Sequence, residues 1–362
     1  MSKESKNVSR RNFLAGAALS VGGVSLMKTD YVLGENAENT ENTENTESKK
    51  PVNQVKFSVF ADFHHHPGVF CSRSAEHMPI IQNRALREKC DLIIHCGDFT
   101  HEPHLETEFV NSYNNFQIPS YHTPGNHDFD TCTPEETFHA YRIENGYYSF
   151  DRNGFRFIVL DANYFRNEDG TFTHYSKGNY FKYTGNAISN LPPEEVKWLS
   201  ETLEKSPFPC ILFSHQSYER EVGGIANWEE IRTLIDSVND RHPGRVRLCI
   251  NGHYHRDHIR ILRNVVYFDL NSASFDWVER THNCYPEELC KEYSLANHTV
   301  IYEDPVHAVI TMNTDGLIQI DGMESKMLYG ITRRDAGLRF ADNCGRPVFP
   351  QVTSATMIMK YE

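Results

Sequence analysis

The sequence predicts an α/β fold in which strands alternate with helices. Apolar runs of strand length occur at Val55–Phe60, Leu92–Cys96, Cys210–Phe213 and Val246–Ile250, and segments of helical period lie between several of them. Each of these four runs is followed within a few residues by Asp, Asn or His. Because ligands of open α/β sheets bind at the carboxyl ends of the strands, we expect a functional site along that edge.

The composition is that of a globular protein that can bury a sizeable core. The chain has 362 residues, of which 39% are hydrophobic and 23% charged, and its formal net charge is −13. Proteins that bind nucleic acid concentrate Lys and Arg, so the acidic balance argues against nucleic acid as a partner. Nothing in the sequence predicts a lipid partner.

Residues 1–35 form a predicted twin-arginine export signal. The segment Ser9–Leu14 places two arginines before a run of small and apolar residues that reaches Met27. That run is too short to cross a bilayer of roughly 30 Å as a helix. We therefore expect the twin-arginine machinery to export the chain to the periplasm or another extracytoplasmic location. No clear cleavage site follows, so an uncleaved N-terminal membrane anchor stays an alternative.

Three further segments complete the expected domain organisation. Residues 36–51 repeat Glu, Asn and Thr and predict a disordered linker, because they bring almost no apolar surface to a core. The folded domain is expected at residues 52–325, and its polar, aromatic-rich segment 275–305 is a candidate lid insert. Residues 326–362 carry no readable motif and form a C-terminal extension of unknown role.

Local signals place several helices and turns. A helix is expected at residues 74–89 with Ser74 as its N-cap. Another begins after Asn190, where two prolines and two glutamates occupy the first turn, and Trp228–Val238 has a third amphipathic period. Two β-hairpins are expected around turns at Asn153-Gly154 and Asn313–Gly316.

The nine cysteines include no C-x-x-C pair. Cys284 and Cys290 are close together in the polar insert, and an exported protein could join them in a disulfide. Four others stand in or beside apolar runs and are expected to be buried small hydrophobes: Cys90, Cys96, Cys210 and Cys249.

Five polar clusters carry the chemistry of the chain. In Asp62-x-His64, an extended backbone would send both side chains to the same side. Gly97 allows a sharp turn that leaves Asp98 at the edge of the sheet. Each cluster alone is weak evidence for a metal site, but all five offer ligand types such as imidazole and carboxylate. The other three clusters are Gly125–Asp128, His215 and Gly252–His255.

In this order the five clusters resemble the motifs of the calcineurin-like metallophosphoesterase family, over roughly Val55 to Ser274. The resemblance implies a four-layer αββα sandwich, with two mixed β-sheets flanked by helices and a site for two divalent metal ions. It implies that His127 is a catalytic histidine oriented by Asp128. The implied metal ligands are Asp62, His64 and His255 for one ion, Asn126, His215 and His253 for the other, and Asp98 as the bridge.

The family resemblance also implies a reaction. Two metal ions about 3.5–4 Å apart lower the pKa of a bridging water and shield the phosphoryl oxygens, so a metal-bridging hydroxide attacks the phosphorus in line. The mixed nitrogen and oxygen ligands favour Mn, Zn, Fe or Co over Ca. His127 would protonate the leaving oxygen or stabilise the transferring group. The tyrosine that purple acid phosphatases carry after Gly-Asp is missing from Phe99–His101, so a tyrosinate-bound ferric site is not expected.

The expected function is that of an exported phosphoesterase acting on a small phosphate ester, with a phosphodiesterase preferred. A phosphomonoesterase and a non-catalytic metal-dependent binding module remain alternatives. His65 and His66 are expected to be neighbours of the site, and His95 to be a core histidine. His101 is either a solvated loop residue or a support for the site, and Arg256 either binds phosphate or is solvated.

Overall fold

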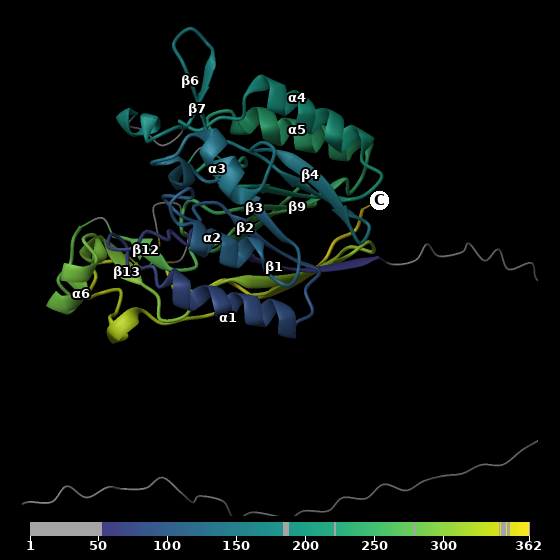
Figure 1. Cartoon of the computed structure of the whole chain (residues 1–362). Coiled ribbons are helices and arrows are strands. Elements are labelled where there is room, and N and C mark those ends of the chain that lie inside the picture. The colour runs from purple at the N-terminus through teal and green to yellow at the C-terminus, as the bar shows by residue number, and fades with distance from the viewer. Residues whose placement is uncertain are drawn as a thin grey trace, which may run out of the picture. The chain divides into compact units, whose positions relative to one another are not determined.

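Two mixed six-stranded β-sheets lie face to face in the middle of the fold (Figure 1). The predicted export signal and linker lie outside the described part of the chain. The computed structural model describes residues 53–183, 188–220, 222–278, 280–339, 341, 345 and 348–361.

The first sheet joins the two ends of the folded chain. Its strands β1, β2 and β3 are parallel, and β14, β15 and β16 extend it in antiparallel fashion beyond β1. The strand at its outer edge, β16, lies within the C-terminal extension, to which no role was assigned from the sequence. In spatial order the strands are β16 (Ala355–Ile358), β15 (Leu317–Asp321), β14 (Ala308–Asn313), β1 (Gln54–Phe60), β2 (Leu92–Cys96) and β3 (Ser120–Thr123).

The second sheet has four parallel strands in its centre and an antiparallel strand at each edge. The parallel strands β5, β8, β9 and β11 are buried along their length, apart from Arg156 in β5, as their nearly continuous apolar sequences predict. In spatial order the strands are β10 (His258–Leu262), β11 (Val265–Asp269), β9 (Val246–Asn251), β8 (Cys210–Ser214), β5 (Phe155–Val159) and β4 (Tyr148–Arg152).

Helices cover the outer faces of both sheets and complete four layers (Figure 1). Phe57 and Val59 of β1 point into the core between the sheets, whereas Phe60 points to the opposite face, toward α1 (Ser74–Arg87) and α2 (Thr107–Asn114). The second sheet packs in the same way against a pair of helices, α4 (Pro193–Lys205) and α5 (Trp228–Arg241). The αββα sandwich of two mixed sheets is therefore confirmed.

Several local predictions are confirmed and one helix start is wrong. Asn153 and Gly154 have φ values of 47° and 79°, as the two-residue turn between β4 and β5 requires. Arg73, not Ser74, is the N-cap of α1, and no side chain caps that end. Ser74 lies inside the helix because its hydroxyl contacts Nδ1 of His65 at 2.6 Å.

The remaining elements are short. Four of them, β12, α6, η3 and β13, belong to the candidate lid insert, and β6 and β7 form a small hairpin. No helix in the described ranges is long and apolar enough to cross a membrane. These short elements are α3 (Pro134–Tyr141), β6 (Tyr164–Arg166), β7 (Phe172–His174), β12 (Phe275–Trp277), α6 (Glu287–Glu292), β13 (Thr299–Ile301) and the 3₁₀-helices η1 (Asn126–Phe129), η2 (Asn179–Lys182), η3 (Ala296–His298) and η4 (Leu328–Gly330).

The disulfide considered between Cys284 and Cys290 does not form. Both are free thiols with different partners: Cys284 Sγ donates to the carbonyl of Asp335 at 3.4 Å, and Cys290 Sγ donates to Oδ1 of Asn297 at 3.3 Å. Cys290 lies in α6, whereas Cys284 precedes that helix. The four cysteines expected in the core are buried.

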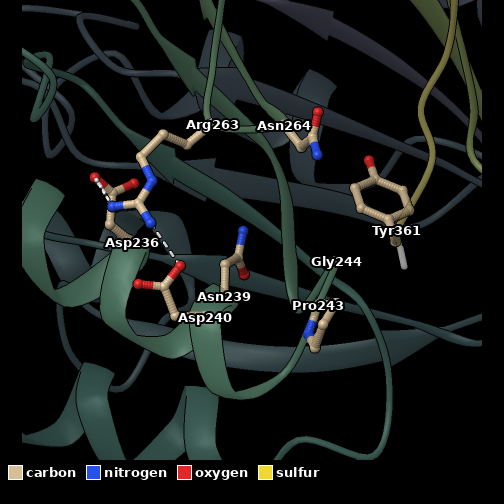
Figure 2. Close-up of a pocket in the computed structure, with 8 residues that line it drawn as sticks. All are labelled: Asp236, Asn239, Asp240, Pro243, Gly244, Arg263, Asn264 and Tyr361. Atoms are coloured by element: carbon tan, nitrogen blue, oxygen red, sulfur yellow. Dashed lines mark hydrogen bonds and ion pairs between the residues drawn. The ribbon is translucent and has the colours of Figure 1, made fainter.

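A polar pocket of about 340 Å³ lies near the start of β9 (Figure 2). Figure 2 shows Arg263 between the carboxylates of Asp236 and Asp240, with ion-pair distances of 3.5 and 2.5 Å. Because this arginine already balances the two acids, the pocket offers little for catalysis. The ligand-type clusters lie instead beyond the other end of β9.

Candidate metal centre

The predicted ligands meet where loops leave the carboxyl ends of parallel strands. Among the described residues, four groups of three side chains have ligand atoms within 4.8 Å of one another, and two of these groups consist only of predicted ligands. The sequence motif Gly252–His255 contributes one histidine to each of these two groups, in line with the division that the family resemblance implies. The first group is Asp62, His64 and His255, and the second is Asp98, His215 and His253.

The first group surrounds one carboxylate oxygen. Oδ1 of Asp62 lies 3.3 Å from Nε2 of His255 and 3.9 Å from Nε2 of His64. The two imidazole nitrogens are themselves 3.0 Å apart. All three side chains are at most 2% exposed, so water is almost excluded from their converging atoms.

The second group is joined to the first by Asp98. Oδ2 of Asp98 lies 2.9 Å from Nε2 of His215 and 3.8 Å from Nε2 of His64, which belongs to the first group. Burial would raise the pKa of Asp98, but the positive charges of His215 and His127 outweigh this and hold it well below its usual value. A carboxylate between two ligand groups is suited to bridge two cations.

The tautomers of His255 and His215 leave the Nε2 atom of each ring without a proton. Nδ1 of His255 lies 2.9 Å from the carbonyl of Phe275, and Nδ1 of His215 lies 2.7 Å from the carbonyl of Cys96. A carbonyl only accepts, so in both rings the proton sits on Nδ1 and the neutral Nε2 offers a lone pair to the site. Lone pairs that converge on carboxylate oxygens need a cation between them, so the residues fit a metal centre.

The raised pKa of His215 also indicates that the ligand atoms favour a positive charge between them. Burial lowers this pKa, but the carboxylates of Asp98 and Asp62 raise it to about 9. Without a metal, a proton would therefore occupy Nε2 of His215 at neutral pH. A bound metal ion would take the place of that positive charge.

The backbone at the centre is strained. The peptide chain adopts positive φ at five of the predicted ligands, although none of them is glycine. Such conformations cost of order 1–3 kcal/mol each and collect at functional sites. The extended geometry expected for Asp62-x-His64 is therefore wrong, although both side chains reach the same group. The five values are 54° at Asp62, 48° at His64, 50° at Asp98, 70° at His253 and 51° at His255.

Two glycines allow the loops to approach one another. Gly97 has a φ of +85°, and a Cβ there would lie 2.2 Å from Nδ1 of His215. A Cβ at Gly252 would lie 2.6 Å from Oδ2 of Asp62. The glycines next to Asp98 and His253 thus create the space in which the ligands converge.

His127 belongs to neither of these two groups, but its ring nitrogen forms one further group with His64 and Asp98 and another with His101 and Asp130. Its backbone N–H donates to Oδ1 of Asp98 at 2.8 Å, and its Nδ1 lies 2.8 Å from Oδ2 of Asp130. Burial would lower the pKa of His127, but Asp130 and Asp98 raise it to about 9. A protonated, partly exposed imidazole beside the metal ligands is placed to donate a proton to a substrate.

The expectation that Asp128 orients His127 is wrong. The side chain of Asp128 is fully buried and turns away, where it accepts hydrogen bonds from the backbone N–H groups of Phe99, Thr100 and Gly125 and from the hydroxyl of Tyr141. It therefore ties the loops after β2 and β3 together. In the 3₁₀ turn of η1, the side chain three residues after His127 is the one that reaches the imidazole, and that residue is Asp130.

Asp130 and His101 are the site residues that the sequence did not assign. Oδ2 of Asp130 also lies 2.8 Å from Nδ1 of His101, and Nε2 of His101 lies 3.0 Å from Nδ1 of His64. Burial lowers the pKa of His101 to about 4, so the ring is neutral. Asp130 therefore orients His101, and His101 in turn orients the ring of His64. A carboxylate three residues after His127 was the available sequence signal.

Asn126 is buried at the start of η1, directly before His127. Its Oδ1 is 3.5 Å from Nε2 of Gln216, and its Nδ2 is 3.3 Å from the hydroxyl of Tyr180. These contacts fix the position of the amide, and its role as a ligand stays a prediction.

The neighbouring residues take defined places. His65 faces away from both groups, with its ring stacked on Phe109 at 3.8 Å. His95 is a core histidine, as expected, and contacts His122 at 2.7 Å. Neither role considered for Arg256 describes its contact, because its guanidinium donates to the carboxylate of Asp276 at 2.5 Å.

Several solved structures are similar to this chain at low sequence identity. A dimetal phosphatase from Danio rerio aligns with a TM-score of 0.52 and 14% identity, over 74% of this chain and 95% of that protein. The anchor protein GAP50 of the Plasmodium inner membrane complex aligns with a TM-score of 0.46 and 11% identity, over 81% and 99%. The NAD nucleotidase of Haemophilus influenzae aligns with a TM-score of 0.40 and 12% identity, over 77% of this chain and 57% of that protein.

The sequence itself matches a family model. No curated protein matches the chain, but the model for calcineurin-like phosphoesterases matches residues 55–257, which is more than half of it. All the predicted metal ligands lie within the matched range, and the family is dimetal-dependent. The chain therefore belongs to the calcineurin-like phosphoesterase family.

Proposed function

We propose that this protein is an exported phosphoesterase that uses two divalent metal ions to hydrolyse a small phosphodiester. The observation that carries the proposal is the convergence of two histidine and carboxylate groups on Asp98, with His127 beside them. The nitrogen and oxygen ligands of these groups fit Mn, Zn, Fe or Co. When bound, two such ions supply a water of lowered pKa and offset negative charge on the phosphoryl oxygens.

The side chains of the protein then have separate tasks. A water molecule releases one proton to solvent, and its oxygen forms a bond to phosphorus while the bond from phosphorus to the ester oxygen breaks. The leaving oxygen takes a proton from Nε2 of His127, whose Nδ1 is held by Asp130. The contact of Nδ1 with the carboxylate of Asp130 favours the protonated imidazole that this step requires. His127 then regains a proton from solvent.

The preference for a diester rests on charge. A phosphomonoester carries close to two negative charges at neutral pH, whereas a diester carries one, so a monoester needs more cations around the phosphoryl group. Arg256 lies one residue after His255, but Asp276 already balances its charge. Its pairing therefore favours the substrate with the smaller charge.

Export through the twin-arginine machinery is proposed on the sequence alone. The paired arginines precede a short apolar run, and this machinery carries folded proteins, which suits an enzyme whose metal centre forms on folding. Replacement of Arg10 and Arg11 by lysine is expected to leave the protein in the cytoplasm, as measured by cell fractionation. Export of this variant at the normal level would contradict the proposal.

Hydrolysis after metal restoration tests the activity. The chelated protein is given Mn²⁺ or Zn²⁺, and release of p-nitrophenol is measured from bis-p-nitrophenyl phosphate and from p-nitrophenyl phosphate. We expect faster release from the diester. Faster release from the monoester would make the protein a phosphatase, and two bound metals with no turnover of either ester would indicate a binding module.

A further inference from the structure

A pocket of about 360 Å³ opens directly beside the metal centre. His253 belongs both to the second ligand group and to the wall of this pocket. A group attached to the phosphorus could therefore extend from the metal centre into the pocket. An engineered cavity of about 150 Å³ holds one benzene molecule, so this pocket has room for a ring together with a sugar.

Much of the pocket wall comes from outside the range that matches the family model. Asp276, Trp277 and Val278 follow the ligand-bearing core in the candidate lid insert, and Leu338 and Val348 come from the C-terminal extension. These segments lie outside the matched residues, so the pocket is a place where the specificity of the site is decided.

Trp277 connects the pocket with the metal centre. Its ring is centred 5.8 Å from the ring of His64 and 6.1 Å from the ring of His255. On the other side it is held by the rings of Phe70 and Phe275 at 5.3 and 5.2 Å. Because Trp277 is only half-buried and lines the pocket, it presents a fixed aromatic surface to a ligand.

The other walls add apolar surface and a cation. Tyr254, Val278, Leu338 and Val348 supply the apolar part, and Arg339 stands exposed at the pocket. Such walls suit a flat, moderately polar group better than a flexible acyl chain or a second phosphate.

We propose that this pocket binds a nucleoside-sized substituent of the substrate, whose aromatic base stacks on Trp277 while its phosphate lies at the metal centre. The inference rests on the proposed function. The substrate class it names is that of nucleotide esters. In a nucleotide ester the sugar would lie between His253 and the indole, and the base would pack against the apolar side chains that line the pocket.

The test compares esters that differ only in the base. Adenosine 5′-monophosphate and ribose 5-phosphate form one pair, and their methyl diesters form the second. We expect the metal-loaded wild type to hydrolyse the base-bearing member of the better pair with at least a tenfold higher kcat/KM. Trp277→Ala should lower kcat/KM for that member by roughly 5- to 150-fold, the effect of losing one base–aromatic stack, and change the base-free member less than threefold.

Controls separate stacking from support of the metal centre. Trp198 lies in α4 and packs its indole on Tyr147, so Trp198→Ala should leave kcat/KM for both substrates unchanged. Leu338→Trp, which fills the pocket and leaves Trp277 in place, should raise KM for the base-bearing ester alone. Metal content is measured in every variant.

Two results would overturn the pocket assignment: no preference of the wild type for the base, or an equal loss on both esters in Trp277→Ala. If the metal-loaded wild type hydrolyses no ester at all, the proposed activity fails instead. Calorimetric binding of adenosine monophosphate and of ribose 5-phosphate then decides the pocket by itself, and equal affinities would reject it.

Discussion

Oδ2 of Asp130 lies 2.8 Å from Nδ1 of His127, and the same oxygen lies 2.8 Å from Nδ1 of His101. One carboxylate therefore orients the proposed proton donor and, through His101, the predicted ligand His64. The hydroxyl of Tyr180 holds the other oxygen of Asp130 at 2.5 Å.

Asp130→Asn is expected to lower kcat by about 10²–10³-fold, since His127 loses the charge that keeps it protonated and oriented. The loss should be larger for an alkyl ester than for a p-nitrophenyl ester, because p-nitrophenolate leaves without a proton. The comparison variant is Asp128→Asn, which should lower thermal stability because it disturbs four buried hydrogen bonds. A silent Asp130→Asn together with a stable but inactive Asp128→Asn would restore Asp128 as the orienting residue.

Asp98→Ala should abolish metal binding and turnover together, because it removes the carboxylate shared by both groups. His127→Ala should keep both metals and lose rate. Metal content measured by mass spectrometry, alongside kcat, distinguishes the two. Loss of metal in His127→Ala would show that this histidine is itself a ligand, and Asp169→Ala in the exposed loop between β6 and β7 serves as the control.

His253→Ala and His255→Ala should each weaken a different metal site. Each variant is expected to bind close to one metal ion tightly instead of two, since its histidine belongs to only one group. Titration with Co²⁺, whose absorption reports its coordination, should give two different spectra for the remaining ion. Identical spectra, or complete loss of metal in both, would contradict the division of the motif between two sites.

The buried side chain of His307 should make the free energy of unfolding of the metal-free protein decrease as the pH falls. This side chain is fully buried, and burial together with Arg84 lowers its pKa to about 3. In the unfolded chain the pKa is about 6.5. As the pH falls below that value, the unfolded chain binds a proton that the folded protein does not, so unfolding becomes easier.

The expected loss from this one residue is about 2 kcal/mol between pH 7 and pH 5. Urea unfolding of the wild type and of His307→Asn at both pH values measures it, because the other histidines titrate equally in both proteins. Asn can keep the donor that faces the carbonyl of Pro305. If the difference between the two proteins is the same at both pH values, His307 does not carry this effect.

The family, the layers and the ligand groups could be predicted from the sequence because they depend on local patterns. Continuous apolar runs such as Leu92–Cys96 specify strands buried on both faces, and side chains that follow parallel strands must meet at one edge. Gly97 signalled a turn that the structure contains.

Other features depended on the tertiary structure. Whether Asp128 or Asp130 reaches His127 is decided by a single turn of 3₁₀-helix, in which a shift of two positions directs a side chain to the opposite side. Cys284 and Cys290 are close in sequence, but their thiols contact different residues, Asp335 and Asn297. Strand β16 has no pattern of its own, and it forms because β15 leaves an open edge.

The sequence by itself thus determined which chemical groups assemble, since residue types and their order along the strands define the ligand sets. Only the tertiary structure decided how those groups are oriented and what surrounds them. Asp130 orients His127, and Trp277 walls the neighbouring pocket, through contacts between residues far apart in the chain or turned by local geometry. Such contacts leave no periodic signal, because each is formed by packing rather than by the preference of a segment.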